Sequence, residues 1–290
     1  MSGVACCSGV VDAGTPLGTE RAIAGVDCYW APPPPSGTTG AAGKSALVIV
    51  TDVFGYKLPN PRLLADGMAA KLGVTAVVPD LFRNGAPPAS CQAAMWTLVD
   101  NPDATFFAKL GAVGSLMWYL VPFILSNSRT ASAAIIRNVI SALRKDHGIT
   151  NVVLAGYCWG GNVAVKLSQD LSIEGLVGVY SAHGGQLDIP KDYELIKRPA
   201  CIVIAGLDFE VVPAKQEIIK KTMDKLRSEG GIANEVHVIE GTQHGFAMRG
   251  DTSNPVVKEK RQQAEQLLAD FFLRCVAEGG GVGGGGGGGL

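Results

Sequence analysis

Three side chains of the types used in covalent catalysis occur in the order cysteine, aspartate, histidine along the second half of the chain. They are Cys158, Asp208 and His244, and each comes shortly after an apolar run of residues. A cysteine attacks a carbonyl carbon as its thiolate, so it needs a base to take the proton and a third group to orient that base. Histidine and a carboxylate can fill these two roles. The three residues therefore predict nucleophilic, acyl-transferring chemistry.

The cysteine lies in the glycine-rich segment GYCWGG at residues 156–161. An apolar run at residues 152–155 predicts a buried strand before it, and the residues after it can form a helix. This is the strand–turn–helix context of a nucleophile elbow, with cysteine in place of the usual serine. The glycines leave room for a strained turn, and the helix N-terminus favours a thiolate or an oxyanion. An inert, buried cysteine is the alternative that this segment leaves open.

The expected partners of the cysteine lie in loops after later strands. Asp208 comes after the apolar run at residues 200–205, and His244 comes after the run at residues 234–239. In α/β-hydrolase sheets the nucleophile, the acid and the histidine follow one another in this chain order. We therefore expect both side chains to meet Cys158 at one site.

The other three histidines have different expected places. His147 ends a predicted helix, where a cation is electrostatically favourable. His237 alternates within an edge strand, and we expect it to face solvent. His183 follows the apolar run at residues 175–180 and is a candidate for the wall of the pocket.

Apolar runs alternate with stretches of helical spacing over most of the chain. The runs predict strands at residues 46–51, 75–78, 152–155, 175–180, 200–205 and 234–239. The helical spacing predicts helices at residues 62–72, 131–146, 214–227 and 256–275. This alternation indicates βαβ units, so the predicted fold class is α/β, with a mostly parallel, doubly wound sheet and helices on both faces.

The two ends of the chain differ from its middle. We expect residues 1–20 to form a partly ordered N-terminal extension and residues 21–276 to form a single domain. Residues 277–290 are nearly all glycine. Such a tail cannot bury apolar area, so we expect it to be disordered.

Composition disfavours several classes of function and indicates a compartment. The net charge is −1, so the chain has no general attraction to nucleic acid. The seven cysteines show no metal-like or paired spacing, which favours a reducing, cytoplasmic compartment over a disulfide scaffold. No secretory signal is apparent at the N-terminus, while organellar targeting stays open.

Residues 104–126 form a long apolar stretch with the length of a transmembrane span. Lys109 and Pro122 within it, with two glycines, oppose a stable membrane span. We expect either a buried helix of the core or a lid whose apolar side chains line a substrate pocket.

Several of these motifs occur together in one known family. The segment at residues 156–161, the loop with Asp208, the HGF motif at residues 244–246 and the DVFG motif at residues 52–55 together resemble the dienelactone hydrolase family. The N-terminal CC and GTPLG motifs and the HGFAMRGD segment look like its eukaryotic branch. The resemblance covers about residues 5–275.

The resemblance implies an α/β-hydrolase fold and a Cys–His–Asp triad with no metal or organic cofactor. On the matching positions Cys158 is the nucleophile, His244 the base and then the acid, and Asp208 the orienting group. The implied oxyanion hole consists of the backbone N–H groups of Trp159 and Val53.

The resemblance also implies roles for three further residues. Asp52 falls where relatives place a carboxylate that influences thiolate formation. Arg83 and Arg249 each lie one residue away from the two arginines that hold a substrate carboxylate in bacterial members. The spacing from Asp208 to the following proline is one residue longer than in those members, which makes Glu210 a competing orienting acid.

The main prediction is a soluble, cofactor-free thiol hydrolase that cleaves a small ester or lactone through an acyl-enzyme. Its expected partner is the small-molecule substrate, and the expected assembly is a monomer or a homodimer. A non-catalytic ligand-binding protein on the same fold is the first alternative. A glycan-active hydrolase, a label sometimes attached to plant relatives, is the second, although the sequence shows no evident flanking pair of catalytic carboxylates.

Overall fold

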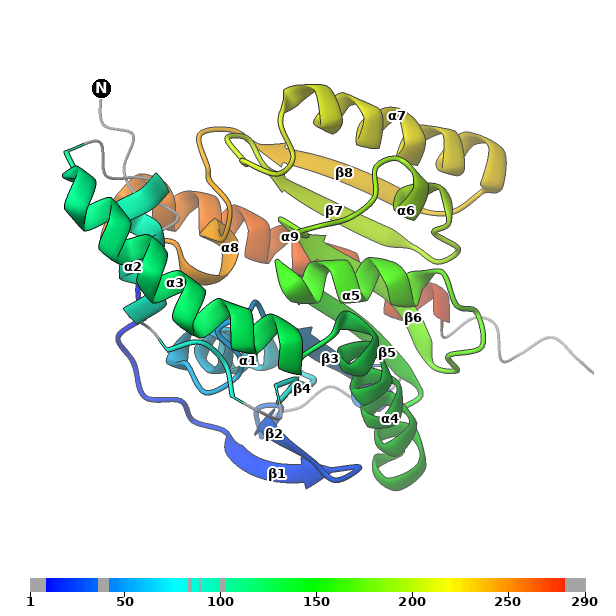
Figure 1. Cartoon of the computed structure of the whole chain (residues 1–290). Helices are drawn as coiled ribbons and strands as arrows, with labels where there is room; N and C mark the ends of the chain where they lie inside the picture. The colour runs from blue at the N-terminus through cyan, green and yellow to red at the C-terminus, as the bar shows by residue number, and fades with distance from the viewer. Residues whose placement is uncertain (1–8, 36–41, 83–84, 89, 100–102, 280–290) are drawn as a thin grey trace, which may run out of the picture.

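The computed structural model describes residues 9–35, 42–82, 85–88, 90–99 and 103–279 (Figure 1). One eight-stranded sheet runs through this part of the chain in the order β1-β2-β4-β3-β5-β6-β7-β8. The strands from β3 to β8 pair in parallel, while β1 and β2 form an antiparallel hairpin at one edge. The predicted α/β class with a mostly parallel sheet is confirmed.

The strands follow the apolar runs of the sequence closely. They are β1 (Thr19–Ile23), β2 (Val26–Ala31), β3 (Ser45–Val50), β4 (Thr75–Pro79), β5 (Asn151–Tyr157), β6 (Leu176–Ala182), β7 (Ala200–Ala205) and β8 (Asn234–Ile239). Every residue of β3, β4, β5 and β7 is buried, as expected for parallel strands covered on both faces. The strand β5, which leads to Cys158, lies between β3 and β6 in the middle of the sheet.

Two layers of helices cover the two faces of the sheet (Figure 1). On one face lie α1 (Pro59–Leu72), α8 (Phe246–Arg249) and α9 (Pro255–Gly279), and on the other lie α4 (Arg129–His147), α5 (Trp159–Ser168), α6 (Lys191–Glu194) and α7 (Pro213–Gly230). Alternate strand residues feed the two cores. In β3, Leu47 belongs to the core on the side of α1 and α9, whereas Val48 belongs to the core on the side of α4 and α5. A short 3₁₀ turn at Ala42–Lys44 precedes β3.

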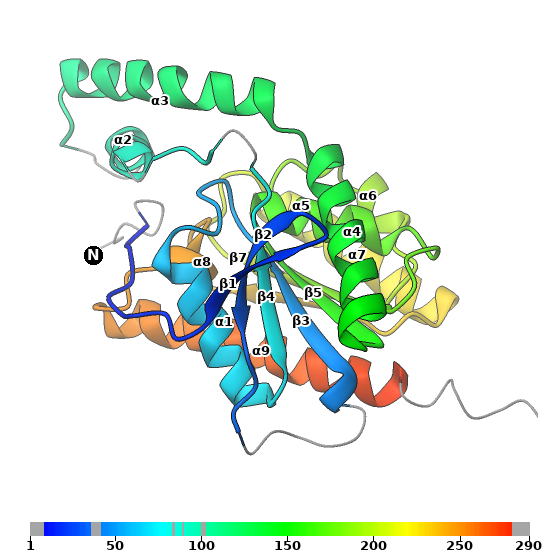
Figure 2. The same ribbon diagram turned by 90° about the horizontal axis from the view of Figure 1, so that it is seen from below.

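The helices α2 (Ser90–Val99) and α3 (Phe106–Ser126) form a further layer that stands off the body of the domain (Figure 2). The prediction of a buried core helix for residues 104–126 is wrong. Only Ala112 and Phe123 of α3 are buried, and Phe107 is 80% exposed. The hydropathy of a segment depends on its composition and does not show whether other elements cover it. The main element packed against α3 is α2. By length and composition α3 could cross a membrane, so the expected absence of a stable span stays a prediction.

The N-terminal segment before β1 packs against helices from both ends of the domain. Val10 donates its N–H to the carbonyl of Arg249 at 2.8 Å, and its own carbonyl accepts from Asn60 Nδ2 at 2.8 Å. Asp12 forms an ion pair of 2.7 Å with Arg261 of α9, and both side chains are nearly buried. Residues 9–17 therefore join α1 to α9.

The boundaries of the ordered region differ slightly from those predicted. The strand β1 begins at Thr19, two residues before the predicted domain start. The helix α9 continues to Gly279, three residues beyond the predicted end at residue 276, because Ala277 and Glu278 favour helix. Residues 1–8 and 280–290 lie outside the described part of the chain.

The close contact between α5 and β3 gives a first prediction. A Cβ atom at Gly160 would lie 1.9 Å from the backbone oxygen of Val50. We expect Gly160→Ala to lower the free energy of unfolding by about 3 kcal/mol, because the obstructing atom belongs to a central strand. The control is Gly111→Ala in α3, where the new methyl group meets open space. This substitution should raise the free energy of unfolding by about 0.5–1 kcal/mol. Urea unfolding of both variants tests this, and equal stabilities would contradict it.

Candidate active site

Cys158 forms the turn between β5 and α5. Its φ of 52° and ψ of −107° are a strained conformation for a residue with a side chain. The N–H of Cys158 donates to the carbonyl of Ala182 at 3.1 Å, which fixes the turn against β6. Gly156 makes the turn possible, since a Cβ there would lie 2.2 Å from the oxygen of Gly160. The half-buried thiol is thus presented beyond the carboxyl end of β5, as the elbow pattern predicts.

His244 and Asp208 lie beside this thiol. Nδ1 of His244 is 2.9 Å from Oδ2 of Asp208, and both side chains are buried. The carboxylate only accepts, so Nδ1 carries the proton and Nε2 is left to act on Cys158, with which the imidazole forms a hydrogen bond. Oδ1 of Asp208 accepts from the N–H of Glu210 at 2.9 Å, which holds the carboxylate in place.

The charges of these three groups support one another. Burial alone would lower the pKa of His244, but the facing thiolate of Cys158 and the hydrogen bond to Asp208 raise it well above its ordinary value. Burial would likewise raise the pKa of Asp208, yet its hydrogen bond with His244 holds that pKa below the ordinary value. The arrangement favours a positively charged imidazole with an ionised aspartate behind it.

Glu210, the competing orienting acid, contacts a different group. Its Oε2 accepts a hydrogen bond of 2.6 Å from the N–H of Gln186, and its side chain lies at the wall of the cavity. The carboxylate that is hydrogen-bonded to the imidazole of His244 is that of Asp208.

The thiol and the imidazole open into a cavity of about 390 Å³. Val53 and Trp159, whose N–H groups form the predicted oxyanion hole, line this cavity together with Cys158. The N–H of Gly160 donates to the carbonyl of Thr51 at 3.0 Å. This bond ties the first turn of α5 to the loop after β3, so the two predicted donors are held on one rigid frame.

The carboxyl-terminal part of α3 forms an apolar wall of the cavity. Leu120, Phe123 and Ile124 all line it. Of the two roles expected for this apolar stretch, its end therefore has the position of a lid over the thiol, while most of the helix is exposed.

Asp52 and Arg249, both predicted near the substrate or the thiol, pair with each other. Nε of Arg249 lies 2.5 Å from Oδ2 of Asp52 in a buried ion pair, and its guanidinium lies 4.4 Å from the ring centre of Phe54. Arg249 lines the cavity, but its charge is compensated by Asp52. Arg83, the other predicted arginine, lies outside the described residues.

His183 is buried behind His244 and does not line the cavity, which corrects the expectation of a pocket-wall residue. Its ring centre lies 5.1 Å from that of His244, and its φ is 40°. Neither ring nitrogen has a hydrogen-bond partner among the described residues. The strained backbone after β6 turns the side chain inward, and the order of residues alone does not show this.

Arg129 is a cavity residue that the sequence did not single out. It is the first residue of α4, and its guanidinium lies 4.2 Å from the ring centre of Trp159. Its Nε is buried without a hydrogen-bond partner among the described residues. Burial lowers the pKa of Arg129, while the negative charges of Cys158 and Glu210 act in the opposite direction. Its place beside the elbow tryptophan depends on how α4 packs on α5, which no local pattern encodes.

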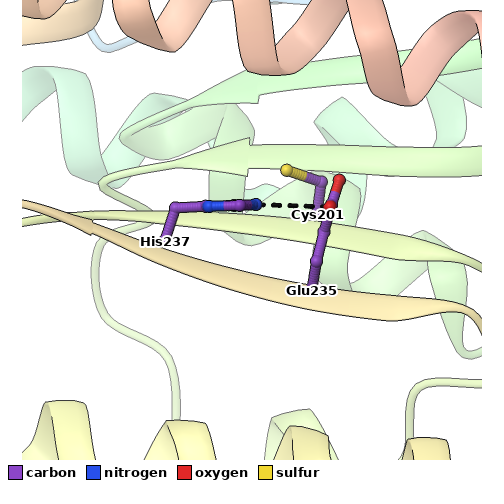
Figure 3. A group of neighbouring side chains, drawn as sticks. All are labelled: Cys201, Glu235 and His237. Atoms are coloured by element: carbon purple, nitrogen blue, oxygen red, sulfur yellow. Dashed lines mark ion pairs between the residues drawn. The ribbon is translucent and has the colours of Figure 1, made fainter.

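One group of potential metal ligands in the described part of the chain lies away from this cavity. Cys201, Glu235 and His237 come together on β7 and β8 (Figure 3). His237 was expected to face solvent, but its side chain is only 33% exposed and its Nε2 lies 3.3 Å from Oε2 of Glu235. On this side of the edge strand, Arg274 of α9 contacts the neighbouring Glu235.

Comparisons with known proteins show which family the sequence resembles. Residues 37–276 match the model of the Dienelactone hydrolase family. Hydrolase tropI of Talaromyces stipitatus is 25% identical over 268 residues, which cover 92% of this chain and 94% of that protein. The carboxymethylenebutenolidase homolog of Mus musculus is 28% identical over 227 residues, or 76% of this chain and 80% of that protein. An endo-1,3;1,4-beta-D-glucanase of Zea mays is 27% identical over 137 residues, only 47% of this chain and 35% of that protein.

Solved structures support the fold. A putative dienelactone hydrolase from Klebsiella pneumoniae superposes with a TM-score of 0.60 at 17% identity, covering 86% of this chain and 93% of that one. A dienelactone hydrolase-like promiscuous phosphotriesterase, P91, from metagenomic libraries gives a TM-score of 0.57 at 17% identity, covering 89% and 98%. The α/β-hydrolase fold predicted from the motifs is confirmed.

The contact between Asp208 and His244 gives a prediction about the two acids. We expect Asp208→Asn to lower kcat by about 10⁴-fold, because an amide can donate to Nδ1 and stabilise the wrong tautomer. Glu210→Gln should lower kcat by less than about tenfold, since its carboxylate does not touch the imidazole. Steady-state hydrolysis of an activated ester measures both, and the reverse order of losses would assign the orienting role to Glu210.

The buried His183 gives a prediction about acid stability. Burial lowers its pKa well below the ordinary value, helped by the nearby positive charge of His244. Below pH about 6.5, His183 therefore binds a proton in the unfolded chain but not in the folded protein. The free energy of unfolding then falls by up to about 1.4 kcal/mol for each pH unit. His183→Phe should remove this loss between about pH 6.5 and 5.

Denaturant unfolding at several pH values measures this contribution. His244 acts with the opposite sign, since its raised pKa gives stability that is present below about pH 6.5 and lost at higher pH, so only a comparison between variants isolates His183. His183→Asn is a second variant, because asparagine tolerates the positive φ. His147→Gln, at an exposed helix end, is the control. Identical acid slopes in wild type and both His183 variants would contradict the prediction.

Proposed function

The chain belongs to the dienelactone hydrolase family and is a hydrolase of ester or lactone bonds, and we propose that it works through a Cys158–His244–Asp208 triad. The observation that carries this proposal is the connected, largely buried path from carboxylate to imidazole to the thiol at the strained turn. Each group in this path has the chemistry of its role: acceptor, proton carrier and nucleophile.

Acylation begins with transfer of the thiol proton from Cys158 to Nε2 of His244. The thiolate attacks the carbonyl carbon of the ester or lactone, and the carbonyl electrons move onto the oxygen. The positive charge on His244 faces the ionised Asp208, which lowers the cost of forming it. When the tetrahedral intermediate collapses, the imidazolium gives its proton to the leaving alkoxide, and a thioester remains on Cys158.

The negative oxygen of the intermediate is stabilised by the N–H groups of Trp159 and Val53. Support for this comes from their position at the cavity beside Cys158 and from the bond between Gly160 and Thr51 that links their two segments. Donors fixed in this way need no rearrangement during the reaction, and each contributes about 3–4 kcal/mol to stabilising the transition state.

Deacylation uses the same groups in reverse. Nε2 of His244 takes a proton from a water molecule, which attacks the thioester carbonyl. The tetrahedral intermediate then expels the thiolate of Cys158 as the carboxylic acid product leaves, and the proton on His244 is returned to this thiolate or to solvent. No cofactor is required for these steps.

The cavity suggests a substrate with an apolar body. Leu120, Phe123 and Ile124 supply the apolar wall, and Arg129 supplies a cation that has no ion pair among the described residues. Arg249, in contrast, is compensated by Asp52. An anionic group on the substrate would therefore contact Arg129. A glycan-active role has less support, because Glu210 is the one carboxylate among the described cavity-lining residues, whereas glycoside hydrolysis uses a flanking pair.

The proposed acyl-enzyme can be detected directly by mass. Brief exposure of the wild type to activated esters and lactones should give an acyl adduct that is absent from Cys158→Ala, with kcat/KM lowered by a factor on the order of 10⁴ or more. Cys28→Ala is the matched control, because burial raises the pKa of that thiol to about 12 and makes it a poor nucleophile. Full activity of Cys158→Ala would sink the proposal, and folded wild type without adduct or hydrolysis would favour a ligand-binding protein.

The role of Arg129 predicts a dependence on substrate charge. We expect Arg129→Gln to raise KM about tenfold or more for an ester that carries a carboxylate, and to change it little for the matched neutral ester, because one charge-assisted contact is lost. Arg137→Gln, on the same helix but paired with Asp170 outside the cavity, is the control. An equal effect on both esters would show that Arg129 only supports the packing of Trp159.

A further inference from the structure

A second cluster of reactive side chains lies at the edge of the sheet, outside the cavity that holds the triad. Cys201 on β7 and Glu235 on β8 are partners in the strand register, and Val203 pairs with His237 two residues further on. Glu235 and His237 therefore point to the same face of the sheet, beside Cys201 (Figure 3). Cys201 belongs to the core formed with α9, so the cluster lies between the sheet and that helix.

The three side chains approach one another as metal ligands do. Sγ of Cys201, a carboxylate oxygen of Glu235 and a ring nitrogen of His237 all lie within 4.8 Å of one another, and Nε2 of His237 is 3.3 Å from Oε2 of Glu235. Tetrahedral zinc bonds of about 2.0–2.3 Å place ligand atoms roughly 3.3–3.7 Å apart. The adjacent strands β7 and β8 hold the backbones of the three residues in place. Small side-chain rotations would therefore be enough for all three atoms to coordinate one ion.

A buried ring nitrogen of His237 belongs to the cluster. Nε2 of His237 is shielded from solvent and has no aligned hydrogen-bond partner among the described residues, although Oε2 of Glu235 is close. The unprotonated nitrogen of an imidazole has a lone pair that a metal ion can bind. Unsatisfied buried polar atoms are uncommon in folded proteins, and an ion is one of the accepted explanations.

The other oxygen of the carboxylate is already held by a positive side chain. Oε1 of Glu235 lies 2.5 Å from Nη2 of Arg274 on α9, which leaves Oε2 on the side of His237. Outer contacts of this kind commonly orient a metal-binding carboxylate. A surface cavity of about 220 Å³, lined by Glu235, Arg274 and Cys275, adjoins the cluster and offers an entry path.

We propose that Cys201, Glu235 and His237 form a binding site for a thiophilic divalent cation of the zinc type. One thiolate, one imidazole and one carboxylate are ligands that zinc takes together, with the fourth position open to water. Binding releases one proton, as Cys201–SH and the free cation give the cation-bound thiolate and H⁺. None of the three residues lines the catalytic cavity, so the bound ion would join β8 to β7 and not take part in hydrolysis.

Metal binding to the full-length protein tests this site separately from activity. The protein is stripped with a chelator in the Cys158→Ala background, which removes the catalytic thiol as a competing ligand. Titration with Co²⁺ should give the near-ultraviolet thiolate-to-cobalt band at one equivalent per chain, and competition with a chromophoric chelator should give the same stoichiometry for Zn²⁺. Zn²⁺ should also raise the melting temperature in a concentration-dependent way.

Two variants locate the ion. His237→Gln, at a partly exposed position, should weaken Zn²⁺ binding by at least about 100-fold while the protein stays folded. Cys201→Ala should abolish the cobalt band, and His147→Gln at the exposed helix end should change neither. Less than 0.1 equivalent (about one chain in ten) of bound Zn²⁺, or binding that survives both variants, would overturn the site. Since no readout uses hydrolysis, an inactive wild type that still binds zinc would contradict the triad and leave the metal site standing.

Discussion

The turn at Cys158 is the constraint on which the other parts of the site depend. A side chain at positive φ between a central strand and a helix is tolerated only if nothing occupies the space around it. Gly156 and Gly160 leave that space, and the approach of α5 to β3 that they permit also brings the segments of Trp159 and Val53 together. Strain at one residue thus aligns the proposed nucleophile, its helix and the proposed oxyanion donors at the same time.

The sequence predicted the parts of the site that follow from strand order. Buried parallel strands place their carboxyl-terminal loops at one edge, so the strand order alone predicts that Cys158, Asp208 and His244 meet. The choice between Asp208 and Glu210 could not be made in this way. It depends on how a short loop folds back, with Asp208 accepting two successive backbone N–H groups, and two residues of sequence spacing do not specify that.

The features that the sequence predicted wrongly, or did not indicate, all depend on contacts between distant segments. The hydropathy of residues 104–126 is the same whether neighbours cover the helix or not, and most of α3 turned out to be exposed. Asp52 and Arg249 are 197 residues apart, and their ion pair changes an expected substrate-binding arginine into a compensated one. Arg129 lies at the cavity because α4 packs beside Trp159, and the sequence around Arg129 does not indicate this contact. Local patterns carry no information on such pairings.

The ion pair between Asp12 and Arg261 has a consequence for synthesis of the chain on the ribosome. It joins the first described segment to the last helix, across 249 residues, and the same N-terminal segment holds the carbonyl of Arg249. The N-terminal strands can form early and are covered by α1, but the face of β5, β6 and β7 on the same side of the sheet stays uncovered until α9 has emerged, and His244 is made only shortly before it. Nascent chains therefore expose apolar surface until α9 has been made, and the proposed triad cannot form before His244 has emerged; chaperones and proteases have access to the chain during this period.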